Sequence, residues 1–328
     1  MTTCTVIIPF YQTKAGVLTR ALNSVFAQTY QNFTVLVIDD QSPFPADKEL
    51  ESLPLAQRER INVIRHQNKG PGGARNTGLN AAAQSDAAFI AFIDSDDIWQ
   101  PNHLADAHEA LIGQGADLYW ASMEADETED FIPYRRFSAL DSQHLLHPLE
   151  SASFLYEITD LKKALLVKWW NFFHMSSFAA TRPVFSKARF DEEFRLAAED
   201  ILFFYSCAMI AQKVIVSDKV TGKRGCGDNL YHGSKFGTKK TLTQLYYSKL
   251  AIERIAKLGN YQDAHSLQCL DNWRNETRDS GAACGFQALI HGRWDAMPLF
   301  IRWIFWDPRM VFAIWGRAQR KYLNFLRK

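Results

Sequence analysis

Three carboxylates fall within four consecutive positions, Asp94 to Asp97, directly after the apolar run Phe89–Ile93. We expect that run to be a buried strand, and the carboxyl end of a strand is where α/β sheets bind ligands. Like charges this close repel each other unless a cation or hydrogen-bond donors offset them. Carboxylate oxygens suit Mg²⁺ or Mn²⁺, ions that also hold substrate phosphates. The segment indicates either a metal and phosphate site or an Asp-rich turn that caps a helix starting at Pro101.

A glycine-rich segment, Asn68–Gly73, comes shortly before Arg75. Such a loop brings backbone amides and a helix N-terminus close to an anion, and Arg75 offers a bidentate donor for a phosphate or a base edge. A flexible loop with a surface arginine would have the same sequence. The chain contains neither GxxxxGK[ST] nor a GxGxxG segment after the first expected strand, which argues against a P-loop and a dinucleotide fold.

Two adjacent acids, Glu199 and Asp200, open a segment whose apolar residues recur at helical spacing. Either carboxylate could accept a proton from a reacting hydroxyl, which is the role of a general base. Acids in a first turn also stabilise the helix N-terminus, so a purely structural role stays open. The pair is a candidate base that is separate from the acidic segment Asp94–Asp97.

Aromatic side chains near these acids could line a binding site. Trp99 could stack on a ring of a ligand, or it could be a core residue at the strand exit. Trp169, Trp170 and His174 could form a wall of the same site, or they could belong to an aromatic core.

The elements that must position these residues alternate between strands and helices. Buried strands are expected at 5–8, 35–38, 61–65 and 89–93, and helices at 17–26, 43–60 and 74–83. Further helices are expected at 101–112 and 149–167, and further strands at 117–123, 177–181 and 214–216. This alternation implies an α/β fold class with an open, mostly parallel, doubly wound sheet. Asp39 and Asp40 end the second strand, so they should face the same crevice as Asp94–Asp97.

Composition narrows the class of protein. The chain has 328 residues, 47% of them hydrophobic, and a formal net charge of +1, so neither a disordered chain nor a globally basic nucleic-acid binder is expected. Its five cysteines lack metal-binding spacing, which indicates reduced thiols in a cytoplasmic protein. The N-terminal apolar run has no basic segment before it, so we expect a strand and not a signal peptide. No apolar stretch reaches the roughly 18 residues of a membrane-spanning helix.

The C-terminal segment 293–328 interleaves aromatic and aliphatic residues with eight arginines and lysines, against only Asp295 and Asp307. Basic, aromatic, amphipathic helices are typical of anionic membrane surfaces, which would give peripheral contact at the inner face of the cytoplasmic membrane. Helices that dock on the rest of the chain, or that form a homodimer interface, would show the same pattern.

Five segments occur in a characteristic order: VIIPFY, ALNSVFAQTYQNFTVLVIDDQS, NKGPGGARNTGL, FIAFIDSDDIWQP and AAEDILFF. In this order they resemble the family 2 glycosyltransferases with the GT-A fold, and the resemblance covers residues 5–235. It implies a GT-A catalytic domain over 1–235, with a nucleotide-sugar half (1–123) and an acceptor half (124–235). Residues 236–328 would form a helical C-terminal extension.

The resemblance also implies roles for single residues. Asp40 would accept a hydrogen bond from the nucleotide base, and Pro9 and Tyr11 would line the same base pocket. Two positions depart from the family pattern. Gln12 replaces a common asparagine and Gln41 a common glycine, which puts details of the nucleotide pocket in doubt.

At the acidic segment, Asp94–Ser95–Asp96 matches the D-x-D motif of the family. Asp96 would be the direct ligand of a Mn²⁺ or Mg²⁺ ion, with Asp94 near the ribose and the metal. Asp200 matches the catalytic base. His232 resembles the histidine of a loop that folds over the donor phosphates in some members, although an ordinary loop histidine is an open alternative.

Together these expectations describe a metal-dependent glycosyltransferase that uses a UDP-sugar. A divalent ion offsets charge on the leaving diphosphate, and a base on the far side of the anomeric carbon permits one direct displacement. The linkage should therefore invert, from an α-linked donor to a β-linked product. Within the family the segments look most like succinoglycan-type exopolysaccharide glucosyltransferases, which implies glucose and an oligosaccharide acceptor on polyprenyl diphosphate. A sugar nucleotidyltransferase and a non-catalytic nucleotide- or carbohydrate-binding module are the alternatives.

Overall fold

The computed structural model describes residues 3–67, 69–124, 137–138, 140, 144–225 and 235–315, without the side chains of 167–172. The chain divides into two compact units. The first comprises Met1–Arg195 with Glu199–Asp228, and the second Leu196–Ala198 with Asn229–Lys328. The expected domain boundary at residue 235 stays a prediction.

The first part of unit 1 is a parallel sheet in the order β3-β2-β1-β4. Its strands are β1 (Cys4–Phe10), β2 (Phe33–Asp39), β3 (Ile61–Arg65) and β4 (Phe89–Phe92). The helices between them are α1 (Val17–Phe26), α2 (Ala46–Leu50), α3 (Leu55–Arg58) and α4 (Gly70–Gln84). Because the strands are parallel, the acids that follow β2 and β4 lie at the same edge of the sheet.

The sheet continues from β4 through an antiparallel strand, and ten strands of the described residues join one sheet. The added strands are β5 (Ile98–Trp99), β6 (Leu118–Glu124), β7 (Leu146–Leu149), β8 (Ala152–Ile158), β9 (Phe178–Thr181) and β10 (Val214–Lys223). Strand β10 pairs with β6 in parallel and with β8 and β5 in antiparallel orientation. Its pairing with β5 brings the end of β10 beside the acidic segment.

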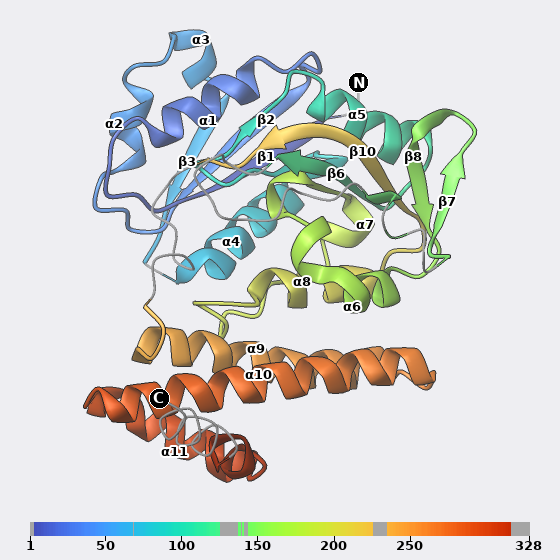
Figure 1. Ribbon diagram of the computed structural model, residues 1–328. Coiled ribbons are helices and arrows are strands. Elements are labelled where there is room, and N and C mark those ends of the chain that lie inside the picture. The colour runs from blue at the N-terminus through green and yellow to red at the C-terminus, as the bar shows by residue number, and fades with distance from the viewer. Residues whose placement is uncertain are drawn as a thin grey trace. The chain divides into compact units, whose positions relative to one another are not determined.

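Helices cover both faces of this sheet, as Figure 1 shows for α1 and α5 (His103–His108) on one side and α4 and α7 (Arg182–Phe185) on the other. The pleat explains the two layers, since successive side chains of a strand point to opposite faces. Val6 and Ile8 belong to the core on the α1 side, whereas Ile7 lies against Gly78 of α4, where a β-carbon would collide with it. The expected α/β fold class is confirmed, but the sheet is mixed and not mostly parallel, because β5, β7, β8 and β9 pair only in antiparallel orientation.

Several predicted elements differ from the structure. The helix expected over 43–60 is two short helices, α2 and α3, each of which begins after a proline (Pro45 and Pro54). The helix α4 begins at Gly70 and not near residue 74, so the glycine-rich segment 70–73 forms its first turn. The helix expected over 101–112 is α5 followed by a π-helical turn, Glu109–Gly113.

The largest error concerns 149–167, which was expected to be one helix. Its first part forms the β7–β8 hairpin, which extends the sheet beyond β10, and only α6 (Leu161–Phe172) is helical. Asp160 begins that helix by accepting a hydrogen bond from the Lys163 amide (3.1 Å). Pairing with the edge of β10 outweighs the local periodicity, because strand formation depends on partners far away in sequence.

The described part of unit 2 is helical, as predicted for residues 236–328. It contains α9 (Lys239–Gly259), α10 (Ala264–Ile290), the short turn η4 (Trp294–Ala296) and α11 (Met297–Trp306). Trp303 and Phe300 of α11 pack on Gly281 and Gly285 of α10, where a β-carbon would collide with each ring. No helix within the described ranges is long and apolar enough to cross a membrane.

Candidate active site

The acidic segment after β4 is held in place by Ser176, from the loop before β9. The Asp94 amide donates to Ser176 Oγ (2.9 Å), which in turn donates to Asp97 Oδ2 (2.5 Å). Trp99 Nε1 donates to the Ser176 carbonyl oxygen (2.6 Å), and the Gly225 amide donates to Asp97 Oδ1 (2.9 Å). Asp97 therefore anchors the turn.

The helix-cap interpretation of this segment fails. Asn102 is the residue before α5, and no side chain caps that helix. Asp97 is buried, and burial, followed by repulsion from Asp96 and Asp94, raises the pKa of its carboxyl well above the usual range. A carboxylate under this repulsion is stabilised by a cation at the same place.

Three potential metal ligands converge here. Asp94, Asp97 and His174 place ligand atoms within 4.8 Å of one another. Burial, followed by the positive charge of Arg224, lowers the pKa of His174 to about 3, so its imidazole is neutral, as a metal ligand must be. Two carboxylates and an imidazole fit a divalent cation of the Mn²⁺ type.

The structure does not test the expected metal ligands Asp96 and His232. Asp96 is partly buried, and its carbonyl oxygen accepts a hydrogen bond from Arg20 Nη2 (2.7 Å). Gly225 packs so closely on that carbonyl group that a β-carbon would collide with it. His232 lies outside the described residues. Both assignments stay predictions, whereas His174 enters the cluster in a role that the sequence did not suggest.

Arg75 connects the acidic segment to the acid pair of α8 (Glu199–Ala208). The residue is 5% exposed, with Nη2 donating to Asp94 Oδ1 (2.7 Å) and Nη1 lying 3.5 Å from Glu199 Oε1. Although burial opposes it, the charges of Asp94 and Glu199 raise the pKa of the guanidinium. The positive charge of Arg75 in turn lowers the pKa of Asp94 against the effect of its own burial. The alternative of a surface arginine on a flexible loop is wrong. A contact between Arg75 and a ligand phosphate stays a prediction.

Both acids of α8 have raised pKa values. Burial, followed by repulsion from Asp200, raises the pKa of Glu199 to about 7 even though Arg75 opposes the shift. Burial also raises the pKa of Asp200, whose Oδ1 accepts a hydrogen bond from the Ile201 amide (2.7 Å). A carboxylate whose pKa approaches neutrality is a better proton acceptor. On these grounds either acid can serve as the general base.

The end of β2 carries the residues expected to bind the nucleotide base. Asp40 is buried and accepts hydrogen bonds from the Lys69 and Gly70 amides (2.9 Å each). His66 Nε2 lies 3.0 Å from Asp40 Oδ1, in a direction that makes no hydrogen bond. Tyr11 is 37% exposed just beyond β1, and Pro9 lies within β1. These positions share the sheet edge with Asp94, and their contact with a base stays a prediction.

Gln12 joins the two acidic strand ends. Its Nε2 donates to Ser95 Oγ (3.2 Å), and its backbone amide and carbonyl group both bond the Ser42 hydroxyl (2.8 Å each). Ser95, expected within the D-x-D motif, is therefore buried against the turn after β1. The departure of Gln12 from the family pattern has a structural use, because its longer side chain reaches Ser95 in the segment after β4.

Three residues of this site escaped the sequence interpretation: Ser176, Gly225 and Asn76. Asn76 exchanges hydrogen bonds with the backbone of Phe190 (2.8 and 2.9 Å), which fixes α4 against the segment before α8. The only available signal was the polar Arg75-Asn76 pair directly after the glycine-rich start of the helix. Ser176 and Gly225 carry no local signal, because their roles depend on tertiary contacts.

The aromatic candidates resolve differently. Trp99 is 4% exposed and stacks on His103 with 4.3 Å between ring centroids, so it is a core residue. The side chains of Trp169 and Trp170 lie outside the described part of the chain. His174 faces the acidic segment, where its Nδ1 lies 3.8 Å from Asp97 Oδ2.

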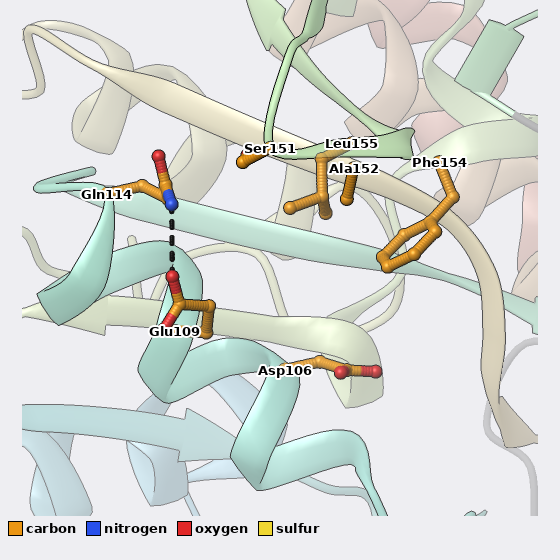
Figure 2. Close-up of a pocket in the computed structure, with 7 residues that line it drawn as sticks. All are labelled: Asp106, Glu109, Gln114, Ser151, Ala152, Phe154 and Leu155. Carbon is orange, nitrogen blue, oxygen red and sulfur yellow. Dashed lines mark hydrogen bonds between the residues drawn. The ribbon is translucent and has the colours of Figure 1, made fainter.

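A separate cavity of about 100 Å³ lies between α5 with its π-helical turn and the β7–β8 hairpin (Figure 2). It is lined by Asp106, Glu109, Gln114, Ser151, Ala152, Phe154 and Leu155. Its two acids already have partners, since Lys219 Nζ lies 3.2 Å from Asp106 and Gln114 donates to Glu109 (3.0 Å). None of the acids at the strand ends lines it, so we do not assign it to the active site.

A doubly wound sheet with an acidic strand end and a separate carboxylate pair is the architecture of a nucleotide-sugar transferase of the GT-A type. Solved structures share this fold. S. aureus TarS 1–349 aligns with a TM-score of 0.61 at 21% identity, over 92% of this chain and 80% of that one. Its complex with UDP-GlcNAc also has a TM-score of 0.61, at 20% identity over 86% and 79%.

The family is defined by sequence. The Glycosyl transferase family 2 model matches residues 5–187, and the chain belongs to this family. The Succinoglycan biosynthesis protein ExoW of Rhizobium meliloti (strain 1021) is 37% identical over 95% of this chain and 96% of its own. An Escherichia coli relative, UDP-Glc:alpha-D-GlcNAc-diphosphoundecaprenol beta-1,3-glucosyltransferase WfgD, is 38% identical over 30% of this chain and 37% of its own. The expectation of a family 2 glycosyltransferase with the GT-A fold is confirmed.

Proposed function

We propose that the chain transfers glucose from UDP-glucose to a hydroxyl of an oligosaccharide on a polyprenyl diphosphate carrier, during bacterial exopolysaccharide or surface polysaccharide synthesis. The similarity to ExoW over nearly the whole chain supports the pathway class. The name of WfgD, which matches over a shorter region, supports the donor, the lipid-linked acceptor and the β linkage. A nucleotidyltransferase and a binding module are not supported by any comparison.

The observation that carries this proposal is the position of Arg75. It contacts Asp94 in the acidic segment and Glu199 in the acid pair, at 2.7 and 3.5 Å. A transferase needs one group of charges for the leaving diphosphate and a separate carboxylate for the attacking hydroxyl. The buried arginine brings both groups into one site while it limits their mutual repulsion.

In the proposed reaction, Asp40, Pro9 and Tyr11 hold the nucleotide base, and the Asp94–Asp97 segment lies at the diphosphate. A Mn²⁺ or Mg²⁺ ion, when bound there, acts as a Lewis acid that offsets charge on the leaving group. Asp200 accepts the proton of the acceptor hydroxyl as that oxygen attacks the anomeric carbon. Attack from the side opposite the diphosphate inverts the linkage from α to β.

The test measures UDP release with Mn²⁺, a set of UDP-sugars and a lipid-linked acceptor. Asp200→Asn should lower kcat by about 10²- to 10⁴-fold and leave UDP affinity unchanged, because only proton transfer is removed. Glu199→Gln is the matched control and should lose much less. If Asp200→Asn keeps wild-type transfer, or if Glu199→Gln shows the larger loss, the base assignment is wrong.

The metal ligand is tested in the same assay. Asp96→Ala should abolish the metal dependence of UDP binding if Asp96 binds the ion directly. Retained dependence in Asp96→Ala, with loss in Asp97→Ala, would assign the ion to Asp94, Asp97 and His174 instead.

We further propose a cytoplasmic protein in peripheral contact with the inner membrane face, with homodimer contact through 236–328 as the alternative.

A further inference from the structure

Unit 2 exposes large apolar side chains on α11 and on the helical residues 310–315 that follow it. Phe305 is 82% exposed and Ile301, one helical turn earlier, 51%. Phe312 and Trp315, again one turn apart, are 77% and 66% exposed. We call these four residues the aromatic face. Side chains one turn apart are neighbours on a helix surface, so each pair forms a continuous apolar strip.

Buried contacts hold α11 so that this face points away from the core of unit 2. Trp303 and Phe300 pack on the glycines of α10, and Met310 is fully buried. Asp307, between the two exposed pairs, is 5% exposed and accepts a hydrogen bond from Arg278 Nε (2.8 Å). The exposure of the aromatic face thus follows from a fixed orientation of the helix.

The charges around the aromatic face are almost all positive. Arg293, Arg302 and Arg309 lie in the same part of the chain. The carboxylate of Asp307 is buried between Arg278 and Arg309. Asp295 is then the one exposed acid between 291 and 315. In the sequence, residues 316–328 add five further basic residues and no acid.

We propose that the aromatic face of unit 2 binds the surface of an anionic lipid bilayer, with its four apolar side chains at the depth of the headgroups. Exposed aromatic residues interleaved with arginines suit an interface that is apolar below and negatively charged above. This inference rests on the proposed function, because a polyprenyl-linked acceptor is confined to a membrane. No described helix could provide the contact by crossing the bilayer.

A second copy of the chain fits this face less well. A two-fold dimer places the same patch on itself, which would bring the arginines of one copy against those of the other. Anionic headgroups instead complement the charge. The two occupants also differ in their response to salt, because surface attraction to lipid weakens as ionic strength rises.

The experiment mixes the full chain with vesicles and measures the bound fraction by flotation. We expect binding to vesicles of equal parts phosphatidylcholine and phosphatidylglycerol, weaker binding at high salt, and little binding to phosphatidylcholine alone. The double variant Phe305→Ser/Phe312→Ser should bind at least about tenfold more weakly, because it removes two inserted rings. The control Leu258→Ser/Leu267→Ser changes two residues of α9 and α10 that are each 44% exposed and should bind as wild type.

Equal binding to both kinds of vesicle, no binding at all, or wild-type binding by the phenylalanine variant would each overturn the proposal. A concentration-dependent doubling of mass in solution that the phenylalanine variant alone loses would assign the face to a homodimer. Glucose transfer from UDP-glucose to the lipid-linked acceptor dissolved in detergent, without a bilayer, separates this inference from the proposed function. The absence of that transfer in a chain that still binds anionic vesicles would contradict the function and leave the membrane proposal standing.

Discussion

Two acidic strand ends lie at the same edge of the sheet, and their surroundings are opposite. At the end of β2, Asp39 is fully buried and accepts hydrogen bonds from the Ser42 and Ala46 amides (2.8 and 3.1 Å) and from Arg65 (3.2 Å). Asp40 beside it accepts from two further amides. The protein itself supplies enough donors for these charges.

At the end of β4 the acids have donors too, but they lie so close together that they repel one another. Asp94 shares Arg75 with Glu199, and the pKa values of Asp97 and Glu199 are both raised by burial and by neighbouring acids. Unfavourable charge of this kind persists at functional sites, where a ligand supplies what the protein lacks. The comparison teaches that acidic strand ends alone do not define a metal site; incomplete compensation does.

The largest expected effect tests the end of β2, where the protein supplies the donors for the acids. Asp39→Ala should lower the free energy of unfolding by about 3 kcal/mol, because the buried Ser42 and Ala46 amides lose their acceptor. Denaturant unfolding measures it. Asp47→Ala is the matched control, since Asp47 lies 3.6 Å from the same Arg65 but is 66% exposed, and it should change stability by less than about 0.5 kcal/mol. Equal effects of both variants would mean that Asp39 is not a structural anchor.

The next effect tests the end of β4, where the acids repel one another. Mn²⁺ at one hundred times its dissociation constant should stabilise the chain by about 2.7 kcal/mol, since it binds the folded state alone. Asp94→Asn and Asp97→Asn should lose this gain, and Asp40→Asn should keep it. Thermal unfolding with and without the ion provides the measurement. Stabilisation that survives at both changed positions would place the ion elsewhere.

The sequence predicted the positions of both acidic strand ends, after β2 and after β4. It could not show that their surroundings differ. Buried strands that end in Asp39 and Asp94 are visible as apolar runs, so the sheet edge and the fold class were predictable. The contacts that bury Asp97 at the end of β4 come from elsewhere in the chain. Ser176 lies 79 positions from Asp97, and Gly225 lies 128 positions away. No local pattern encodes such contacts.

Errors in the predicted elements have a similar cause, with one exception. The β7–β8 hairpin was taken for a helix because its pairing with β10 depends on residues about sixty positions later. The broken helix over 43–60, by contrast, had a local signal, because Pro54 cannot continue a helix. The early start of α4 makes the glycine-rich segment 70–73 part of the helix, whereas Arg75 lies on the helix in the prediction as well as in the structure.

The smallest expected effect concerns Glu199 and depends on pH. Its pKa is raised from 4.5 to about 7 on folding, so the unfolded chain loses this proton at lower pH than the folded chain does. Below pH 4.5 both states are protonated, and between pH 4.5 and 7 ionisation favours the unfolded state, so the contribution of this group to stability falls as pH rises. Glutamine at position 199 does not titrate. The free energy of unfolding of Glu199→Gln, relative to that of the wild type, should therefore rise by about 2 kcal/mol between pH 4.5 and 7.

Unfolding at a series of pH values checks the slope, with Glu124→Gln, an exposed acid at the end of β6, as the control that should leave it unchanged. A Glu199→Gln variant that keeps the wild-type slope would show that Arg75 already neutralises this carboxylate as fully as its partners neutralise Asp39. The acids near the ends of β2 and β4 would then be stabilised to a similar degree, and the raised pKa would be confined to Asp97. A lost slope instead means that the incomplete compensation extends from the acidic segment through Arg75 to α8, which is the condition for a base that accepts protons near neutral pH.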